Sequence, residues 1–150
     1  MGRKVYPEEM KRKRREMKER LWNWGQAMEE FNWKEEELKK LEGLYVMQKK
    51  IWEGHETEKA RKELNRIQKE YEGEKRRLRM EMVEILRKKA WVDCRIQKLT
   101  ANETSFLQMR FEKGYGFAYI GMKLYLSRAT LFRMQDRILD MLIAEDSGTE

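Results

Sequence analysis

The chain has a single proline among its 150 residues, and that proline is Pro7. Proline is the strongest breaker of helices, so every position after residue 7 is open to helix formation. The remaining composition is rich in Glu, Lys, Leu, Met and Arg, which are good helix formers. The sequence therefore predicts an all-α protein: a long N-terminal helical hairpin or coiled coil, followed by a shorter C-terminal helical domain.

The first predicted helix runs over residues 8–52, with Pro7 in its first turn. Its apolar residues are spaced by three and four places, as in a coiled coil. The spacing changes phase partway, so we expect the stripe to bend near residues 33–38 or at Gly43. Two sets of residues form the stripe, namely Met17, Leu21, Trp24, Met28 and Phe31, then Leu38, Leu41, Tyr45, Gln48 and Trp52.

A second long helix is predicted over residues 58–97, after a boundary at Gly54 and with Thr57 as its cap. At 1.5 Å per residue it would be roughly 60 Å long, so it needs a partner along its length. That partner is either the first helix, folded back as an antiparallel hairpin, or another copy of the chain, and the heptads do not choose between them. Its heptad positions are Leu64, Tyr71, Leu78, Ile85, Val92 and Leu99.

Residues 117–136, FAYIGMKLYLSRATLFRMQD, have the layout of a helix-turn-helix. Apolar residues fall where two short helices must bury a shared face, and the small Gly121 suits a close crossing. Ser127 stands where its hydroxyl can cap a second helix that begins at Arg128. Tyr125 departs from the pattern, because glycine is usual at that place in the turn. The apolar positions are Ile120, Leu124, Leu126, Leu131 and Met134.

The outward face of the second helix is expected to read DNA in the major groove. Arg128 and Arg133 can pair with guanine edges or clamp phosphates, and Phe132 can lie against a thymine methyl group. The predicted DNA-binding residues are Ser127, Arg128, Ala129, Thr130, Phe132, Arg133 and Arg137.

A supporting helix is predicted just before this motif, over residues 101–113. Thr100 and Glu103 have the spacing of a capping box, in which each side chain bonds the backbone of the other residue. Gly114 is expected to end the helix.

The stretch from Lys98 to Leu142 resembles the fourth region of bacterial sigma factors, which carries a DNA-reading helix-turn-helix. The preceding charged helices, with Leu21, Trp22 and Trp24, make the whole chain similar to the ArpU/RinA-type phage and prophage transcriptional regulators. The resemblance implies an activator of late genes. The residues that match the sigma pattern are Leu99, Thr100, Glu103, Arg110, Phe111, Gly114, Ile120, Leu124, Ser127, Arg128, Thr130, Leu131 and Arg133.

These features predict a sequence-specific DNA-binding regulator of transcription. Residues 1–98 are assigned to oligomerisation or partner binding, 99–143 to DNA binding and 144–150 to a polar tail. The expected partners are double-stranded DNA, RNA polymerase and a second copy of the chain, since dimers reading two half-sites gain affinity. Two alternatives remain open: a small terminase subunit that recognises packaging DNA, and a coiled-coil adaptor that binds RNA polymerase.

Charge and composition agree with an intracellular DNA-binding protein. The formal net charge is +7, which suits a polyanionic partner. No apolar run approaches the ~20 residues of a membrane span, so no membrane association is expected. We expect a cytoplasmic location, which is the cytoplasm of the bacterial host if the chain is phage-encoded. Neither catalysis nor a metal or other cofactor is expected, because the single His55 falls in a turn and Cys94 is interpreted as a small buried thiol.

Two further features have alternative interpretations. The basic segment 11–20 either contacts DNA or forms a solvated or partner-binding face. The KRRLR run at 75–79 either tracks phosphates beside the main site or forms a solvated face paired with neighbouring glutamates. The five tryptophans either fill a helical core or an oligomer interface, or leave some of Trp22, Trp24 and Trp33 exposed as contacts for another protein.

Overall fold

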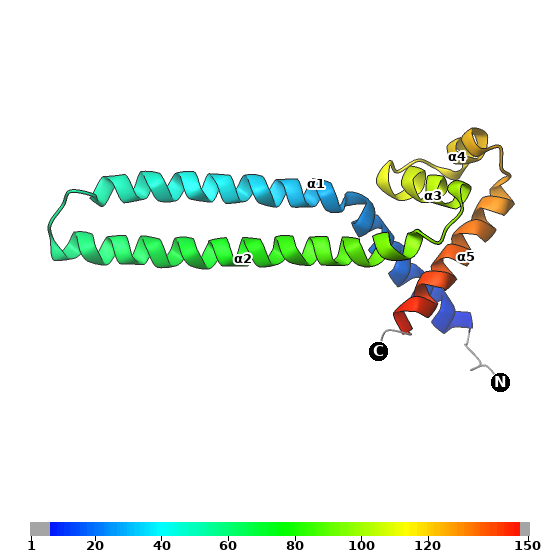
Figure 1. The fold of residues 1–150 in the computed structure, drawn as a ribbon, viewed down its shortest axis with the longest axis horizontal. Coiled ribbons are helices and arrows are strands. Elements are labelled where there is room, and N and C mark those ends of the chain that lie inside the picture. The colour runs from blue at the N-terminus through cyan, green and yellow to red at the C-terminus, as the bar shows by residue number, and fades with distance from the viewer. Residues whose placement is uncertain (1–6, 148–150) are drawn as a thin grey trace. The chain divides into compact units, whose positions relative to one another are not determined.

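The computed structural model describes residues 7–147, and within this range the regular elements are all helices (Figure 1). The predicted all-α class is therefore confirmed. None of these helices carries an apolar stretch long enough to cross a bilayer. In chain order the elements are α1 (Pro7–Trp52), α2 (Glu58–Ile96), α3 (Ala101–Leu107), a π-helical turn (Gln108–Glu112), α4 (Phe117–Leu124) and α5 (Arg128–Ser147).

Two compact units divide the chain, and α1 and α2 each contribute to both. The hairpin unit is residues 27–88. The core unit combines the described residues up to Gln26 with those from Lys89 onward. The predicted division instead separated 1–98 from 99–143 and 144–150. In the structure α5 continues to Ser147, into the predicted tail, and residues 148–150 lie outside the described range.

The hairpin unit consists of the second half of α1 and most of α2, joined by a short turn. Gly54 has φ +86°, a left-handed conformation that glycine adopts without strain. The Thr57 hydroxyl accepts a hydrogen bond of 3.1 Å from the backbone N–H of Ala60 and so caps α2. The boundary at Gly54 and the Thr57 cap were both predicted, and both are confirmed.

The two arms of the hairpin unit pair along one apolar seam. The rings of Tyr45 and Tyr71 stack with centroids 4.2 Å apart, and Lys34 forms an ion pair of 3.0 Å with Glu81. Within this unit the predicted heptad positions of α2 are buried or half-buried, and Leu78 is the most enclosed of them. The partner of α2 here is thus α1 of the same chain, so its heptads do not require a second copy.

The seam of α1 changes phase earlier than the sequence suggested. Met28, which was expected in the stripe, is 47% exposed, and Ala27 is buried in its place at 3%. The step from Trp24 to Ala27 is three residues, where a regular stripe would take four, and Lys34 then continues the seam. The shift therefore falls at Ala27, which is also the boundary between the two units.

The core unit has a continuous hydrophobic core to which every helix contributes. Met17, Leu21 and Trp24 of α1 pack there against residues from the C-terminal third of the chain. The Trp24 indole N–H also donates a hydrogen bond of 2.8 Å to Asp93 of α2. The buried cluster is Met17, Leu21, Trp24, Val92, Phe106, Leu107, Phe111, Ile120, Leu131, Ile138, Leu139 and Leu142.

Candidate nucleic-acid interface

The interface is built on α3, whose first turn is closed by the predicted capping box. The Thr100 hydroxyl accepts a hydrogen bond of 3.2 Å from the Glu103 N–H, and the Glu103 carboxylate accepts one of 3.1 Å from the Thr100 N–H. Glu103 is buried, and its second oxygen accepts a bond of 2.8 Å from Arg137 of α5. The Glu103 carboxylate therefore both caps the N-terminus of α3 and links α3 to α5.

The pKa of Glu103 lies below its usual range. Burial acts to raise it, but the hydrogen bonds with the Thr100 backbone and side chain and the positive charge of Arg137 outweigh that effect. The group is therefore ionised at neutral pH, and the ion pair with Arg137 is present under physiological conditions.

A π-helical turn and a glycine carry the chain from α3 to α4. Gly114 ends the segment with φ +74°, as predicted, and the next N–H, of Tyr115, bonds to the carbonyl of Met109 at 2.9 Å. Gly25 of α1 lies directly against this turn, because a Cβ placed on it would lie 2.0 Å from the Phe111 carbonyl oxygen. The close approach of α1 was not predicted, since no local pattern reports a contact across so many residues.

A short turn joins α4 to α5, as the predicted helix-turn-helix requires. The N–H of Leu126 bonds to the carbonyl of Gly121 at 3.0 Å. Gly121 is required to be small, because an added Cβ would lie 2.7 Å from the Leu126 carbonyl oxygen. Tyr125 adopts φ 58° and ψ 41°, so this residue holds the left-handed conformation usually given to glycine. Its side chain is 93% exposed.

Helix α5 begins at Arg128, as predicted, with Ser127 as its cap. The Ser127 hydroxyl accepts a hydrogen bond of 3.1 Å from the Thr130 N–H and also contacts the Thr130 hydroxyl at 2.8 Å. The shared face of α4 and α5 is apolar, with Ile120 and Leu131 fully buried. Leu124, Leu126 and Met134 complete this face as half-buried residues that pack against the core.

The outward face of α5 presents most of the predicted DNA-binding residues to solvent. Ser127, Arg128, Ala129 and Arg133 are exposed, whereas Thr130 is half-buried beside the cap. Within residues 7–147 the structure gives Arg128 and Arg133 no carboxylate partner within 4.0 Å. Arg133 makes only a long hydrogen bond of 3.4 Å to Thr130.

Phe132 and Arg137 are less free than the sequence suggested. The Phe132 ring packs against Phe117 with centroids 4.4 Å apart, and the guanidinium of Arg128 lies 5.5 Å from its centre. Phe132 is still 41% exposed, so part of the residue remains accessible. Arg137 uses one nitrogen for its bond to Glu103.

The basic segment at the start of α1 supplies partners for the acidic residues of α5. Arg14 makes hydrogen bonds of 2.9 and 2.8 Å to the two carboxylate oxygens of Asp140, and lies 3.6 Å from Asp136. The bond with Asp140 holds the pKa of Arg14 above its usual value. Arg20 pairs with Asp146 at 3.2 Å. This segment therefore packs on α5 and offsets the charge of Asp136, Asp140 and Asp146.

The exposed face of α4 carries aromatic and basic residues that sequence reasoning did not select. The rings of Tyr115 and Tyr119 lie 4.6 Å apart, and Lys123 is 5.5 Å from the Tyr119 ring. Met122 beside them is 64% exposed. The spacing of Tyr119, Met122 and Lys123 along α4, with Tyr115 just before it, was a readable signal, because the first helix of such a motif crosses the DNA backbone.

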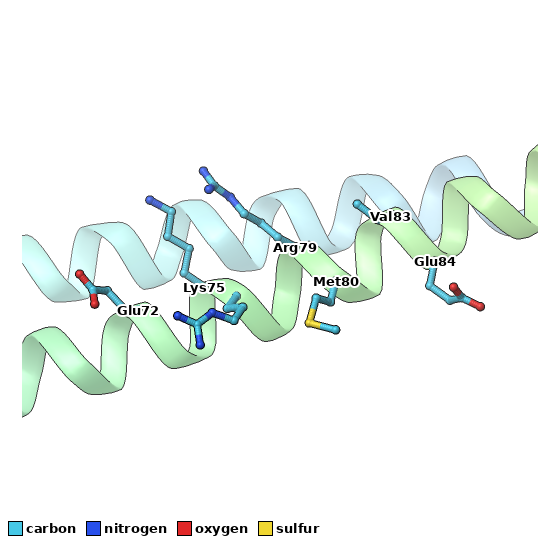
Figure 2. Close-up of a pocket in the computed structure, with 7 residues that line it drawn as sticks. Glu72, Lys75, Arg79, Met80, Val83 and Glu84 are labelled. Carbon is cyan, nitrogen blue, oxygen red and sulfur yellow. The ribbon is translucent and has the colours of Figure 1, made fainter.

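A second basic surface lies on α2 in the hairpin unit. Lys75, Arg76 and Arg79 line a groove together with Met80 and Val83. Figure 2 shows the side chains of Lys75, Arg79, Met80 and Val83 along α2. Glu72 and Glu84 also line this groove, so its positive charge is partly offset.

The tryptophans divide between the two interpretations. Trp24 is buried, and Trp22 packs edge-on against Phe111 with centroids 4.9 Å apart, whereas Trp33 is 63% exposed. Trp91 is sandwiched, with Arg20 at 4.2 Å and Arg95 at 4.0 Å from its ring.

The remaining reactive side chains form no site. The expectation of a buried Cys94 was wrong, because this thiol lies on the solvent side of α2. His55 lies exposed in the hairpin turn. Over the described range, no group of three or more His, Cys, Asp and Glu side chains could hold a metal ion.

Comparison of the chain with protein-family models, with curated proteins and with solved structures found no significant match. The likeness to sigma factors and to the ArpU/RinA-type regulators therefore depends on the sequence pattern given above.

Proposed function

We propose that the protein is a sequence-specific regulator of transcription that binds double-stranded DNA through α5. The observation that carries the proposal is the exposed pair Arg128 and Arg133 on the first turns of a Ser127-capped helix, neither of them in an ion pair within the described chain. Arginine at this place in a helix-turn-helix reaches the O6 and N7 atoms of guanine in the major groove.

The charges around α5 support DNA binding by the same face of this helix. The carboxylates of Asp136 and Asp140 would repel phosphates, but both lie beside Arg14, which offsets their charge. Lys123 and Tyr119 on α4, with Tyr115 just before that helix, supply donors for the phosphate backbone next to the reading helix. The basic excess of the whole chain adds a sequence-independent attraction.

The biological role that best fits this architecture is that of a phage or prophage late-gene activator of the ArpU/RinA type. In this role the protein acts on DNA in the bacterial cytoplasm as a homodimer and engages RNA polymerase. A homodimer doubles the number of base pairs that a single reading helix can contact.

The test begins with a pool of randomised duplexes, from which the wild-type protein selects its preferred sequence. Arg128→Ala and Arg133→Ala are then expected to weaken binding to the selected duplex by about 1–3 kcal/mol each, and to weaken binding to a scrambled duplex less. Fluorescence anisotropy at physiological salt measures both affinities.

Arg61→Ala is the matched control, since Arg61 is an exposed arginine in the hairpin unit without an ion pair in the described chain. Its affinity for the selected duplex should equal that of the wild type. Sequence reading by α5 is rejected if both α5 variants bind like this control, or if the wild type selects no sequence from the pool.

A further inference from the structure

A second apolar stripe runs along α1 in the hairpin unit, apart from the seam that faces α2. Leu44, Met47 and Ile51 are spaced by three and four residues, and they are 56%, 66% and 64% exposed. Leu44 and Ile51 each precede a seam residue, Tyr45 and Trp52, by one place, which rotates the stripe by about 100° around the helix. Spacing of this kind is the signature of a surface that packs on another helix.

Gly43 lies beside this stripe, and its own chain gives no reason for a glycine there. A Cβ added to Gly43 would meet no atom within 4 Å. Glycine inside a helix is less favourable than alanine, so the position is unfavourable for the isolated hairpin. A second helix that approaches closely at Gly43 would benefit from the missing side chain.

Together these residues form a complete socket for a side chain from another helix. Lys40, Gly43, Leu44 and Met47 occupy positions i, i+3, i+4 and i+7, which is the arrangement of a hole in knobs-into-holes packing. Gly43 makes this hole deep enough for a branched side chain. Ile51 on the same stripe is a branched knob of suitable size.

We propose that the stripe formed by Leu44, Met47 and Ile51 is the dimer interface of the protein, packed antiparallel against the same stripe of a second copy. Ile51 of one copy enters the hole around Gly43 of the other, and the twofold axis passes close to Met47. Because the knob and the hole lie on one stripe, the surface is self-complementary, as a twofold interface requires.

Charge selects the antiparallel direction. When Leu44 lies level with Ile51 of the partner copy, Lys40 lies level with the partner copy's hairpin turn, which carries Glu53 and Glu56. A parallel arrangement would instead bring lysine opposite lysine at positions 39, 40, 49 and 50, which is repulsive. The overlapping segment, about 24 Å of helix over residues 40–55, is short, so the dimer should dissociate on dilution.

This inference rests on the homodimer of the proposed function but not on DNA binding, and its test contains no DNA. Sedimentation velocity of the full-length wild-type chain over a concentration series should show a monomer–dimer equilibrium. Met47→Glu should be monomeric at every concentration, because it places two like charges next to each other at the twofold axis. Val46→Glu is the matched control: Val46 is 47% exposed on a different face of α1, and its variant should dimerise like the wild type.

Gly43→Gln separates loss of the interface from loss of the fold. The substitution removes a helix-interior glycine and should raise the thermal stability of the monomer, while its side chain fills the hole and abolishes the dimer. A variant that is both more stable and monomeric cannot owe its monomeric state to unfolding.

Cysteine cross-linking tests the register of the two copies in a Cys94→Ser background. A mixture of Leu44→Cys and Ile51→Cys proteins should oxidise to a covalent dimer far more completely than either protein alone. A wild type that stays monomeric at every concentration overturns the proposal. So does a dimer that Met47→Glu leaves intact or that the mixed cysteines fail to cross-link, because its interface then lies elsewhere.

Discussion

The core unit and the hairpin unit are stabilised in different ways. In the core unit, large side chains such as Phe106, Phe111 and Leu139 are completely buried, and they meet residues more than eighty positions away. In the hairpin unit the buried residues are fewer and smaller, and ion pairs such as those of Arg66 and Arg77 link neighbouring turns of one exposed helix. Since exposed pairs contribute little, the hairpin should be the weaker and more locally stabilised of the two.

Truncating a core side chain in each unit is the strongest test of this contrast. Phe106→Ala should cost about 3–5 kcal/mol, because it empties a fully buried site. Leu64→Ala, at a half-buried seam position, should cost about half as much. Chemical denaturation followed by circular dichroism gives both values, and equal losses would show that the hairpin is as tightly packed as the core.

Substituting alanine for two helix-interior glycines should change the stability of the protein in opposite directions. Gly25→Ala forces a methyl group against the Phe111 carbonyl and should destabilise the core unit by about 1–3 kcal/mol. Gly73→Ala in α2 meets open space and should stabilise the hairpin unit by about 0.5–1 kcal/mol. Differential scanning calorimetry measures the pair, and a stabilising Gly25→Ala would mean that α1 does not approach the π-helical turn.

Glu103 gives the core unit a pH dependence that depends on a buried carboxylate, whereas Glu81 and Glu84 of the hairpin unit, whose pKa values are also lowered, lie closer to solvent. Its folded pKa is lowered, so its contribution is complete above the unfolded pKa of about 4.3 and is lost as the pH falls through the folded value. Glu103→Ala should cost about 1–2 kcal/mol at neutral pH, through loss of the cap.

Glu103→Gln keeps the capping geometry but not the charge, so its deficit relative to the wild type should disappear in acid. Urea titrations from pH 7 down to about pH 3 measure the difference in unfolding free energy between the variant and the wild type. This difference should shrink as the pH falls below the unfolded pKa of the carboxylate. A deficit that persists unchanged at the lowest pH would mean that the carboxylate charge is not what Thr100 and Arg137 stabilise.

The smallest expected effect is a gain in stability from a substitution in the turn between α4 and α5. Tyr125→Gly removes a side chain from a left-handed position where it is almost fully exposed, and should stabilise the core unit by about 0.5–1 kcal/mol. Tyr119→Gly, in the regular part of α4, should destabilise it by a comparable amount. Thermal melts compare the two, and a loss at Tyr125 would reveal a contact of the ring that outweighs the backbone strain.

Sequence alone gave the local features of this fold, because their causes lie within a few residues. The capping box of Thr100 and Glu103, the Ser127 cap and the glycine turn at Gly54 were all predicted and are all present. The exposure of Arg128 and Arg133 followed from the same helical spacing.

Long-range partners were not predictable from spacing. The bond of Arg14 to Asp140 spans 126 positions, and neither residue stands in a recognisable motif. The ion pair of Arg137 with Glu103 was missed for the same reason, although the cap role of Glu103 was foreseen. The phase shift at Ala27 was not predicted, because Met28 has the larger apolar side chain and was therefore assigned to the stripe. The shift coincides with the boundary between the two units, which the spacing does not reveal.

The division of α1 and α2 between the units makes the hairpin an insertion within the core unit. The core unit cannot close until its first segment meets residues near the end of the chain, across about sixty intervening residues, which would cost roughly 4 kcal/mol of loop-closure entropy for a flexible linker. The hairpin removes most of that cost, because its contacts are local and its two arms bring Trp24 and Asp93 within one hydrogen bond. Folding of the hairpin should therefore precede and accelerate folding of the core unit, so the hairpin would act as a built-in folding scaffold.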